Sequence, residues 1–255
     1  MTVPDLKQPL LSVRDLCIKT STGLPILDGV SFDVGAGEIV ALVGESGSGK
    51  TVAARATMRL LPKVIRPVAG EILFNQRDVL KMTDAEIRAI RGAQIGMVFQ
   101  EPMVSLNPAM TIGAQLIEGL RLHEKLGIDA ALTRATDMLE RVRIADPAAC
   151  LAAFPHQFSG GMRQRIMLAS VMLLRPKLLI ADEPTTALDT LTQREVLEVM
   201  VDLTRTFGTA VLLITHNLGL VAQYAKKVVV LERGRLIEAG AVDDVLHRPR
   251  ETYTR

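Results

Sequence analysis

Short apolar runs alternate along the chain with longer stretches in which apolar residues recur at helical spacing. The run Ile39–Val43 is β-branched and bounded by glycines, as a strand buried on both faces should be. Lys177–Glu183 and Ala210–His216 have the same character, and Glu71–Asn75 and Ile95–Phe99 predict two further strands. Strands interleaved with helices predict an α/β fold whose mostly parallel sheet is covered on both faces.

A block in the middle of the chain, about residues 102–175, carries only helical patterns. Thr111 is expected to cap a first helix that Gly127 closes, because hydroxyl side chains favour helix starts and glycine favours helix ends. Asp129 is expected to cap a second helix, and Asp146–Pro147 to begin a third. The block therefore predicts an α-helical subdomain inserted into the alternating pattern.

Three further segments complete the pattern. The segment after Lys50 predicts a helix that ends before Pro62, since the residue before a proline avoids helical geometry. Thr190 is expected to open a helix that Gly208 ends. The segment Val228–Gly240 predicts a β-hairpin.

Composition excludes several classes of protein. The 255 residues carry a net charge of only +2, aromatic residues make up 3%, and tryptophan is absent, so no nucleic-acid partner is expected. Cys17 and Cys150 lie far apart without CxxC spacing, which predicts neither a disulfide framework nor a zinc site. No signal stretch opens the chain, and no window approaches the roughly 20 apolar residues of a membrane span. We expect a soluble, cytoplasmic protein that reaches a membrane only through a partner.

The sequence GESGSGKT, Gly44–Thr51, matches the phosphate-binding pattern GxxxxGK[ST]. It lies between a predicted buried strand and a predicted helix, the context that this motif requires. Its glycines let backbone N–H groups converge on phosphate oxygens, and the helix dipole adds to the attraction. Lys50 is expected to reach the β- and γ-phosphates, and the Thr51 hydroxyl to ligate magnesium. The motif predicts a nucleoside triphosphate.

Polar side chains stand at, or directly after, the ends of three predicted strands. Asp182 and Glu183 end one of them, and two adjacent carboxylates resist joint ionisation unless a cation is near. Successive strand residues point to opposite sides of a sheet, so the two side chains can have different roles: Asp182 is expected near magnesium, and Glu183 beside an attacking water. His216 ends the next strand, where an imidazole can contact a γ-phosphate or position the water. Gln100 follows another strand, and its amide could ligate magnesium or the water.

A second glycine-containing segment, FSGGMRQR at Phe158–Arg165, stands at a predicted helix start. Ser159 and the backbone N–H groups of Gly160 and Gly161 would form a second anion-binding helix N-terminus there, in addition to the P-loop. Two such anion-binding sites in one chain suggest that one nucleotide is held from two sides. A small-molecule kinase would have no use for the second site.

In their order along the chain, these motifs resemble those of the ATP-binding subunits of ABC transporters. The matching motifs are the P-loop GESGSGKT, the Q-loop residue Gln100, the signature FSGGMRQR, the Walker B run LLIADE, the D-loop TALD (Thr186–Asp189) and His216. The resemblance covers almost the whole chain, and motifs in this order rarely coincide by accident.

This resemblance implies a fold, an activity and a set of functional residues. The fold would be an α/β P-loop NTPase (RecA-like) core with an antiparallel β subdomain and the inserted helical subdomain, all in one ABC-type domain over residues 1–255. The activity would be hydrolysis of ATP with Mg²⁺. Two subunits, identical or paralogous, would pack head to tail, so that the signature of one completes the P-loop site of the other. The implied catalytic residues are Glu183 and His216, the implied magnesium ligands are Thr51, Gln100 and Asp182, and the implied nucleotide-binding residues are Gly44, Glu45, Ser46, Gly47, Ser48, Gly49, Lys50, Thr51, Val52, Gln100, Ser159, Gly160, Gly161, Met162 and Asp189.

Finer details resemble the oligopeptide, dipeptide and nickel importer ATPases. These are the runs QEPMVSLNP and ADEPTTALD, the final ETYTR, and Met162 in place of the usual signature glutamine. The implied work is ATP-driven import at the cytoplasmic face of a bacterial inner membrane, with two permease subunits and a solute-binding protein. Thr20 stands near the position at which many relatives place an aromatic residue against adenine.

A non-transport ABC ATPase is the alternative class. Relatives that act in DNA repair carry zinc-binding insertions or long coiled coils, and those that act on ribosomes carry two ATPase modules and basic linkers. None of these features is in the sequence. An ATPase that serves a soluble complex stays open as the alternative function.

Overall fold

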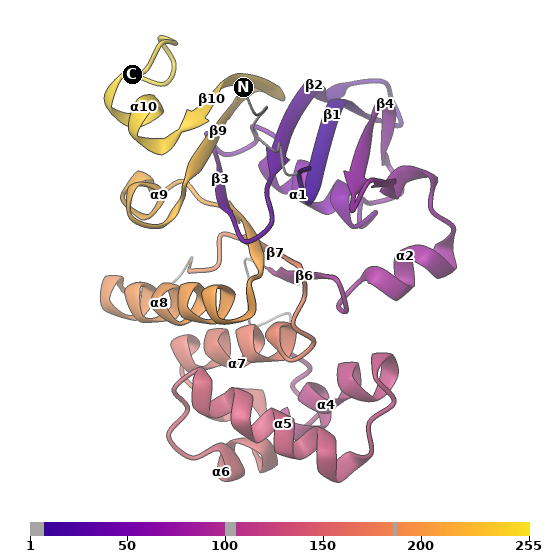
Figure 1. Cartoon of the computed structure of the whole chain (residues 1–255), viewed down its shortest axis with the longest axis vertical. Coiled ribbons are helices and arrows are strands. Elements are labelled where there is room, and N and C mark those ends of the chain that lie inside the picture. The colour runs from indigo at the N-terminus through magenta and orange to yellow at the C-terminus, as the bar shows by residue number, and fades with distance from the viewer. Residues whose placement is uncertain (1–7, 100–105, 186–187) are drawn as a thin grey trace, which may run out of the picture. The chain divides into compact units, whose positions relative to one another are not determined.

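The computed structural model describes residues 8–99, 106–185 and 188–255, which form two compact units (Figure 1). Unit 1 contains the described residues up to Arg88 together with Ala210–Arg255, and unit 2 contains Ala89–Thr209. Unit 1 is thus built from both ends of the chain. The predicted helical block falls inside unit 2, which also contains two strands and a long helix.

Four strands of unit 1 form an antiparallel sheet in the order β2-β1-β4-β5. Within this sheet the sequence pattern predicts only Glu71–Asn75, which overlaps the end of β4, and does not predict β1, because the pairings of β1 shift register several times and interrupt the alternation of buried and exposed residues. The expected antiparallel β subdomain is present. Its strands are β1 (Leu11–Thr20), β2 (Pro25–Val34), β4 (Ile65–Phe74) and β5 (Arg77–Asp78).

The other strands of unit 1 are ordered β10-β9-β3-β8. Strand β3 pairs in parallel with both β8 and β9, and β9 pairs with β10 as the expected hairpin. Residues near position 40 thus lie beside residues beyond position 210. The strands are β3 (Ile39–Val43), β8 (Ala210–Ile214), β9 (Lys227–Glu232) and β10 (Arg235–Ala241); the helices are α1 (Lys50–Thr57), the 3-10 helix η1 (Val79–Lys81), α2 (Asp84–Ile90, whose last two residues are assigned to unit 2), α9 (Leu218–Tyr224) and α10 (Val242–His247).

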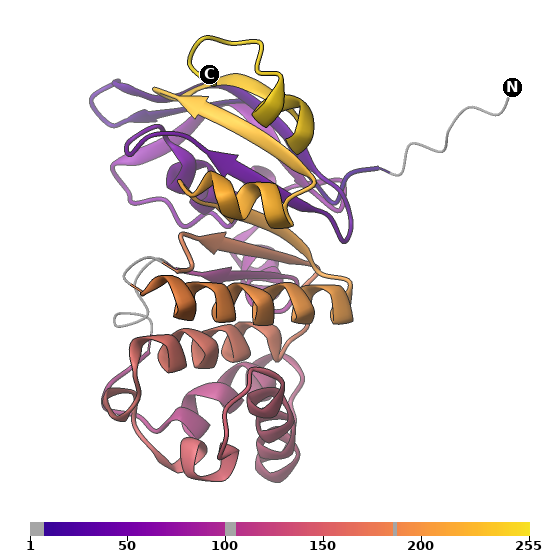
Figure 2. The ribbon, with the colours of Figure 1, turned by 90° about the vertical axis from the view of Figure 1, so that its left-hand side faces the viewer.

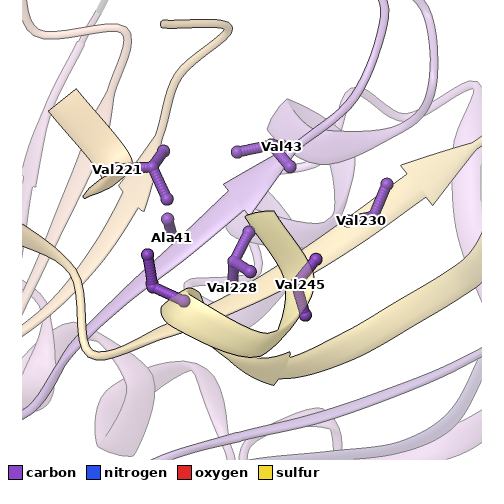
Figure 3. Packing of buried hydrophobic residues seen from close by; sticks show 7 residues of the cluster. Ala41, Val43, Val221, Val228, Val230 and Val245 are labelled. Atoms are coloured by element: carbon purple, nitrogen blue, oxygen red, sulfur yellow. The ribbon is translucent and has the colours of Figure 1, made fainter. Parts of the chain in front are cut away.

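A valine-rich cluster fills the space between these strands and the last helices (Figure 3). Its buried members come from β3, β9, α9 and α10 and include Val43, Val230 and Val245. Helix α10 lies against β10 (Figure 2), and the ring of Tyr253, beyond α10, packs on the cluster. The C-terminal residues therefore share a core with the strand that leads into the P-loop.

Unit 2 combines a pair of parallel strands with helices. Helix α7 packs against α4 and α5 on one side and against α8 on the other (Figure 1). Parallel pairing, expected from the sequence, is thus confirmed in both units. The elements are β6 (Ile95–Val98), β7 (Leu178–Asp182), α4 (Ile112–His123), α5 (Ile128–Arg141), α6 (Pro147–Ala152), the 3-10 helix η2 (Pro155–Gln157), α7 (Gly160–Met172) and α8 (Thr190–Phe207).

Two helix boundaries differ from expectation. Thr111 caps α4 as predicted, but α4 ends at His123, and Gly127 is the N-cap of α5 rather than the end of α4. Lys125 takes the left-handed conformation between the helices (φ 55°), while Gly127 is extended. Asp129 therefore lies in the first turn of α5, where its charge favours the helix dipole, and does not cap it.

Other features of the described ranges bear on chemistry and location. No helix within these ranges is long and apolar enough to cross a membrane. Cys17 and Cys150 are both free thiols. Burial raises the pKa of the Cys150 thiol to about 11, so this side chain stays protonated at neutral pH.

Candidate nucleotide-binding site

The P-loop joins β3 to α1 in unit 1 and depends on glycine at specific points. Gly44, Gly47 and Gly49 have φ values of 145°, 82° and 99°, which side-chain-bearing residues rarely adopt. A Cβ on Gly44 would lie 2.0 Å from the carbonyl oxygen of Leu231, and one on Gly49 would lie 2.4 Å from Cδ2 of Leu27. Glycine thus provides both the conformation and the space for the loop.

Lys50 folds back over this loop. Its Nζ donates hydrogen bonds to the carbonyl oxygens of Gly44 and Glu45, each at 2.8 Å, and contacts Oγ of Ser48 at 3.4 Å. The residue is only 7% exposed. The protein thus holds a buried positive charge at the rim of the loop.

The start of α1 suits an anion. Its N-cap is Gly49, no side chain in the described part of the chain caps it, and its first turn carries no acidic residue. The helix dipole and Lys50 therefore act in the same direction on a negatively charged group. Thr51 and Val52, also predicted to bind nucleotide, are half-buried in this first turn.

The β9–β10 turn contacts the backbone of the P-loop and helps to hold it in place. The Gly234 N–H donates to the Ser48 carbonyl at 3.1 Å, and the Gly234 carbonyl accepts from the Asp28 N–H at 2.8 Å. Gly234 has φ 81°, and a Cβ there would lie 2.2 Å from the Ile26 carbonyl oxygen. The sequence pattern predicts this turn but gives no sign that it touches the P-loop.

His216 and the start of the P-loop line one pocket of unit 1. The pocket has a volume of about 330 Å³, and its lining includes Gly44, Glu45, His216, Leu218 and Tyr253. His216 is exposed and lies two residues beyond the end of β8, not within the strand as predicted. The expected proximity of His216 to the P-loop is thus present.

The carboxylate pair stands at the end of β7 in unit 2. Asp182 is the last residue of the strand and only 1% exposed. Glu183 lies just outside the strand, is half-buried and has φ 45°. Strand alternation, on which their different roles were predicted, therefore does not apply to Glu183, whose backbone has left the extended conformation.

The signature segment begins α7 in unit 2. Ser159 is the N-cap, and its Oγ accepts the Met162 N–H at 3.3 Å. Ser159 and Gly160 are exposed, whereas Gly161 is buried. A Cβ on Gly161 would lie 2.3 Å from Cγ2 of Thr192 in α8. The second glycine of the signature therefore provides room for close packing of two helices.

Asp189 caps α8 beside that contact. Its carboxylate accepts the Thr192 N–H at 3.1 Å and the Thr192 hydroxyl at 2.7 Å. These hydrogen bonds, first that of the hydroxyl, lower the pKa of Asp189. The cap fixes Thr192, and through it the surface on which Gly161 packs.

Two predicted features fall elsewhere. Gln100 and the first two residues of TALD, 186–187, lie outside the described residues. Thr20, where an aromatic residue is common among relatives, ends β1, and its hydroxyl accepts the Leu24 N–H at 3.1 Å and bonds to the Thr22 hydroxyl. This threonine organises the β1–β2 turn.

A glycine-rich loop between a parallel strand and a helix, with an inward-folded lysine, defines a P-loop NTPase. A sequence profile described as ABC transporter matches residues 27–186. The oligopeptide transport ATP-binding protein OppD of Bacillus subtilis (strain 168) is 47% identical over 251 residues, which cover 96% of this chain and 70% of OppD. The chain belongs to the ABC transporter family.

Solved structures agree with this assignment. The structure of cbiO1 from Clostridium perfringens, part of the ABC transporter complex cbiONQ, has a TM-score of 0.81 and 28% identity and covers 94% of this chain and 91% of its own. The dimeric structure of MJ0796, an ABC transporter cassette, has a TM-score of 0.80 at 24% identity, with 91% and 98% coverage. The fold is that of an ABC-type ATPase.

Proposed function

We propose that the chain is the ATP-hydrolysing subunit that powers import of a peptide-like solute through an ABC transporter at the inner face of a bacterial membrane. One observation carries the substrate class: the 47% identity to the oligopeptide transport protein over nearly the whole chain. A dipeptide transport ATP-binding protein, DppD of Escherichia coli (strain K12), supports the same class, with 44% identity over 90% of this chain and 70% of its own length.

The P-loop fits a triphosphate on physical grounds. Lys50, the α1 dipole and the glycine-permitted loop place positive charge and backbone N–H groups where an anion would lie. We infer that Lys50 would exchange the loop carbonyls for the terminal phosphates when ATP binds. Charge-assisted hydrogen bonds of this kind are about twice as strong as neutral ones.

The donor atoms also fit magnesium. Thr51 and the buried Asp182 carry oxygen atoms, the type of ligand that Mg²⁺ prefers, and would each contribute one. In the described ranges, no group of three or more His, Cys, Asp or Glu side chains could hold a metal ion alone. Substrate phosphates and Gln100 would complete the coordination, and the ion would neutralise phosphate charge. The joint magnesium site of Thr51, Gln100 and Asp182 stays a prediction from the sequence.

The reaction needs an attacking water, and Glu183 is our candidate for orienting it. His216 would contact the γ-phosphate, as its shared pocket with the P-loop supports. In a second copy or a paralogue, the signature residues Ser159, Gly160, Gly161 and Met162, with Asp189 nearby, would close the site from the other side. Two permease subunits and a solute-binding protein would complete the transporter.

The test is Glu183→Gln in the subunit assembled with its permease subunits in vesicles. Hydrolysis of ATP should fall at least about a hundredfold, a loss of the size reported for general acid–base groups. Uptake of radiolabelled peptides should stop, while ATP-dependent dimerisation, measured by light scattering, should persist.

Glu195→Gln provides the matched control, because Glu195 is an exposed acid on α8. It should leave hydrolysis and uptake at the wild-type rates. Normal hydrolysis by Glu183→Gln would show that another group orients the water. Hydrolysis without uptake of any peptide, with all transporter subunits present, would favour the soluble-complex alternative.

A further inference from the structure

The C-terminal segment, defined here as residues 248–255, reaches the P-loop within unit 1. The backbone N–H of Glu45 donates a hydrogen bond to the hydroxyl oxygen of Tyr253 at 3.2 Å. The ring of Tyr253 is half-buried and packs on the valine-rich cluster. That cluster includes Val43 and Val245 (Figure 3). Two residues separated by most of the chain are thus joined at the first turn of the nucleotide loop.

Strand β10 anchors this segment. The carboxylate of Glu238 accepts the N–H groups of Arg250 at 3.0 Å and Glu251 at 3.4 Å. These bonds, first that of Arg250, lower the pKa of Glu238, so the carboxylate is ionised at neutral pH and keeps the contact. The backbone that leads to Tyr253 is therefore anchored to β10 next to the P-loop contact.

One peptide group of the P-loop is held from both ends. The peptide that links Gly44 to Glu45 offers its carbonyl to Lys50 Nζ at 2.8 Å and its N–H to Tyr253 Oη at 3.2 Å. In a planar trans peptide these two groups point in opposite directions, so fixing one fixes the other. A flip of this peptide would turn the N–H toward the ammonium of Lys50 and the carbonyl toward Tyr253.

Gly44 makes such a flip a real alternative. It has no Cβ and already occupies φ 145°, so its backbone can rotate with little steric resistance from its own side chain. In the observed orientation the Tyr253 hydroxyl accepts the Glu45 N–H, while the Gly44 carbonyl accepts a hydrogen bond from Lys50. The Gly44–Glu45 peptide thus links the lysine ammonium to a tyrosine that lies beyond α10.

We propose that Tyr253 is a positioning residue for nucleotide binding: it holds the Gly44–Glu45 peptide so that Lys50 stands ready for the phosphates. This inference rests on the proposed function, because Lys50 matters only if the loop binds a nucleotide. Tyr253 acts through Lys50 and does not touch the nucleotide itself.

The test begins with Tyr253→Phe in the full chain, since this change removes only the hydroxyl and keeps the ring on the cluster. We expect ATP to bind about two- to tenfold more weakly, the factor that one net hydrogen bond supplies. Tyr224→Phe is the matched control, because Tyr224 is the other tyrosine of the chain, and it should leave the affinity unchanged. Affinities are measured by NMR titration, which tolerates weak binding, and thermal unfolding is followed in parallel.

A double-mutant cycle separates positioning from general support of the fold. In a Lys50→Ala chain, Tyr253→Phe should change ATP affinity by much less than in the wild type, because the lysine it positions is gone. A hydroxyl that merely stabilises unit 1 would weaken binding by the same factor in both backgrounds, and that result would overturn the proposal. An unchanged affinity for Tyr253→Phe would overturn it too.

The wild-type titration separates this inference from the proposed function. A wild-type chain that does not bind ATP at all would contradict the proposed function itself. A wild-type chain that binds ATP, together with a Tyr253→Phe chain of equal affinity, would contradict only the role of Tyr253.

Discussion

The P-loop and the signature segment both place glycines at a helix start, yet the two use them differently. In the P-loop, Gly44 and Gly49 adopt positive φ, and the helix start carries no side-chain cap in the described part of the chain. In the signature, Gly160 and Gly161 begin an ordinary helix that Ser159 caps. Glycine provides both conformation and space in the first case, and space alone in the second. The same letter in a motif can thus encode two physical requirements.

Among these glycine and cap substitutions, Gly44→Ala should lower the free energy of unfolding the most. Its Cβ would lie 2.0 Å from a backbone oxygen, which cannot move aside as a side chain could, and its φ of 145° adds strain. We expect a loss of about 3 kcal/mol or more in the free energy of unfolding, measured by urea denaturation. Gly47→Ala is the control: φ is 82° but nothing lies within 4 Å of its Cβ, so only about 1–2 kcal/mol should be lost. Equal losses would contradict the steric argument.

Gly161→Ala should lower the free energy of unfolding by less than Gly44→Ala does. A second substitution should restore most of the lost stability. The new methyl would meet Cγ2 of Thr192, which cannot rotate away without breaking its hydroxyl bond to Asp189. Overpacking, partly offset by the better helix propensity of alanine, predicts a net loss of about 1–2 kcal/mol. Thr192→Ser removes the methyl and keeps the hydroxyl, so the double variant should regain most of the lost unfolding free energy. A double variant as unstable as Gly161→Ala would show that backbone conformation, as in the P-loop, is what this glycine provides.

Ser159→Ala should cost about 1 kcal/mol of unfolding free energy, because the Met162 N–H loses its capping partner. Ser159→Asp should restore the cap and the stability. It should nevertheless abolish ATP-dependent dimerisation, since a carboxylate would then face the phosphates of the partner's nucleotide. Normal dimerisation of Ser159→Asp would leave Ser159 with the capping role alone.

Asp189→Asn should change the stability to unfolding least, and mainly at low pH. Because hydrogen bonds lower the folded pKa of Asp189 below its unfolded value of about 3.9, its contribution is fully present above that value and is lost as pH falls through the folded pKa. Asn also caps helices but does not titrate. Urea midpoints at pH 7 and pH 3 should therefore show that the wild type loses more stability than the variant. Equal losses would mean that Asp189 does not contribute to the acid dependence.

The central strands and most caps could be predicted from the sequence because they depend on local chemistry. The run before Gly44 is apolar and β-branched, and Thr111, Asp146 and Gly208 lie where caps usually do, as the structure confirms. Local chemistry was insufficient for Gly127, because glycine suits both ends of a helix and the neighbouring Lys125 took the left-handed position.

Contacts between distant residues could not be predicted in this way. The sequence predicts both the P-loop and the β9–β10 turn but not the bond from Gly234 to Ser48, which depends on the parallel pairing of β3 with β9. The bond to Tyr253 depends further on the anchoring of the C-terminal segment by Glu238. No periodicity or motif spacing reports such pairings, since they arise only once the chain has folded.

The discontinuity of unit 1 has a consequence for biosynthesis. Strand β3 is made well before its partner β9 and before the turn that supports the P-loop. At about 5–20 residues per second, roughly ten seconds or more separate them on the ribosome. During that interval the nascent chain carries a nucleotide loop without its contact to the β9–β10 turn and a strand β3 without its partner β9. The nucleotide loop therefore gains its full set of supporting contacts only after the β9–β10 turn and Tyr253 have been made.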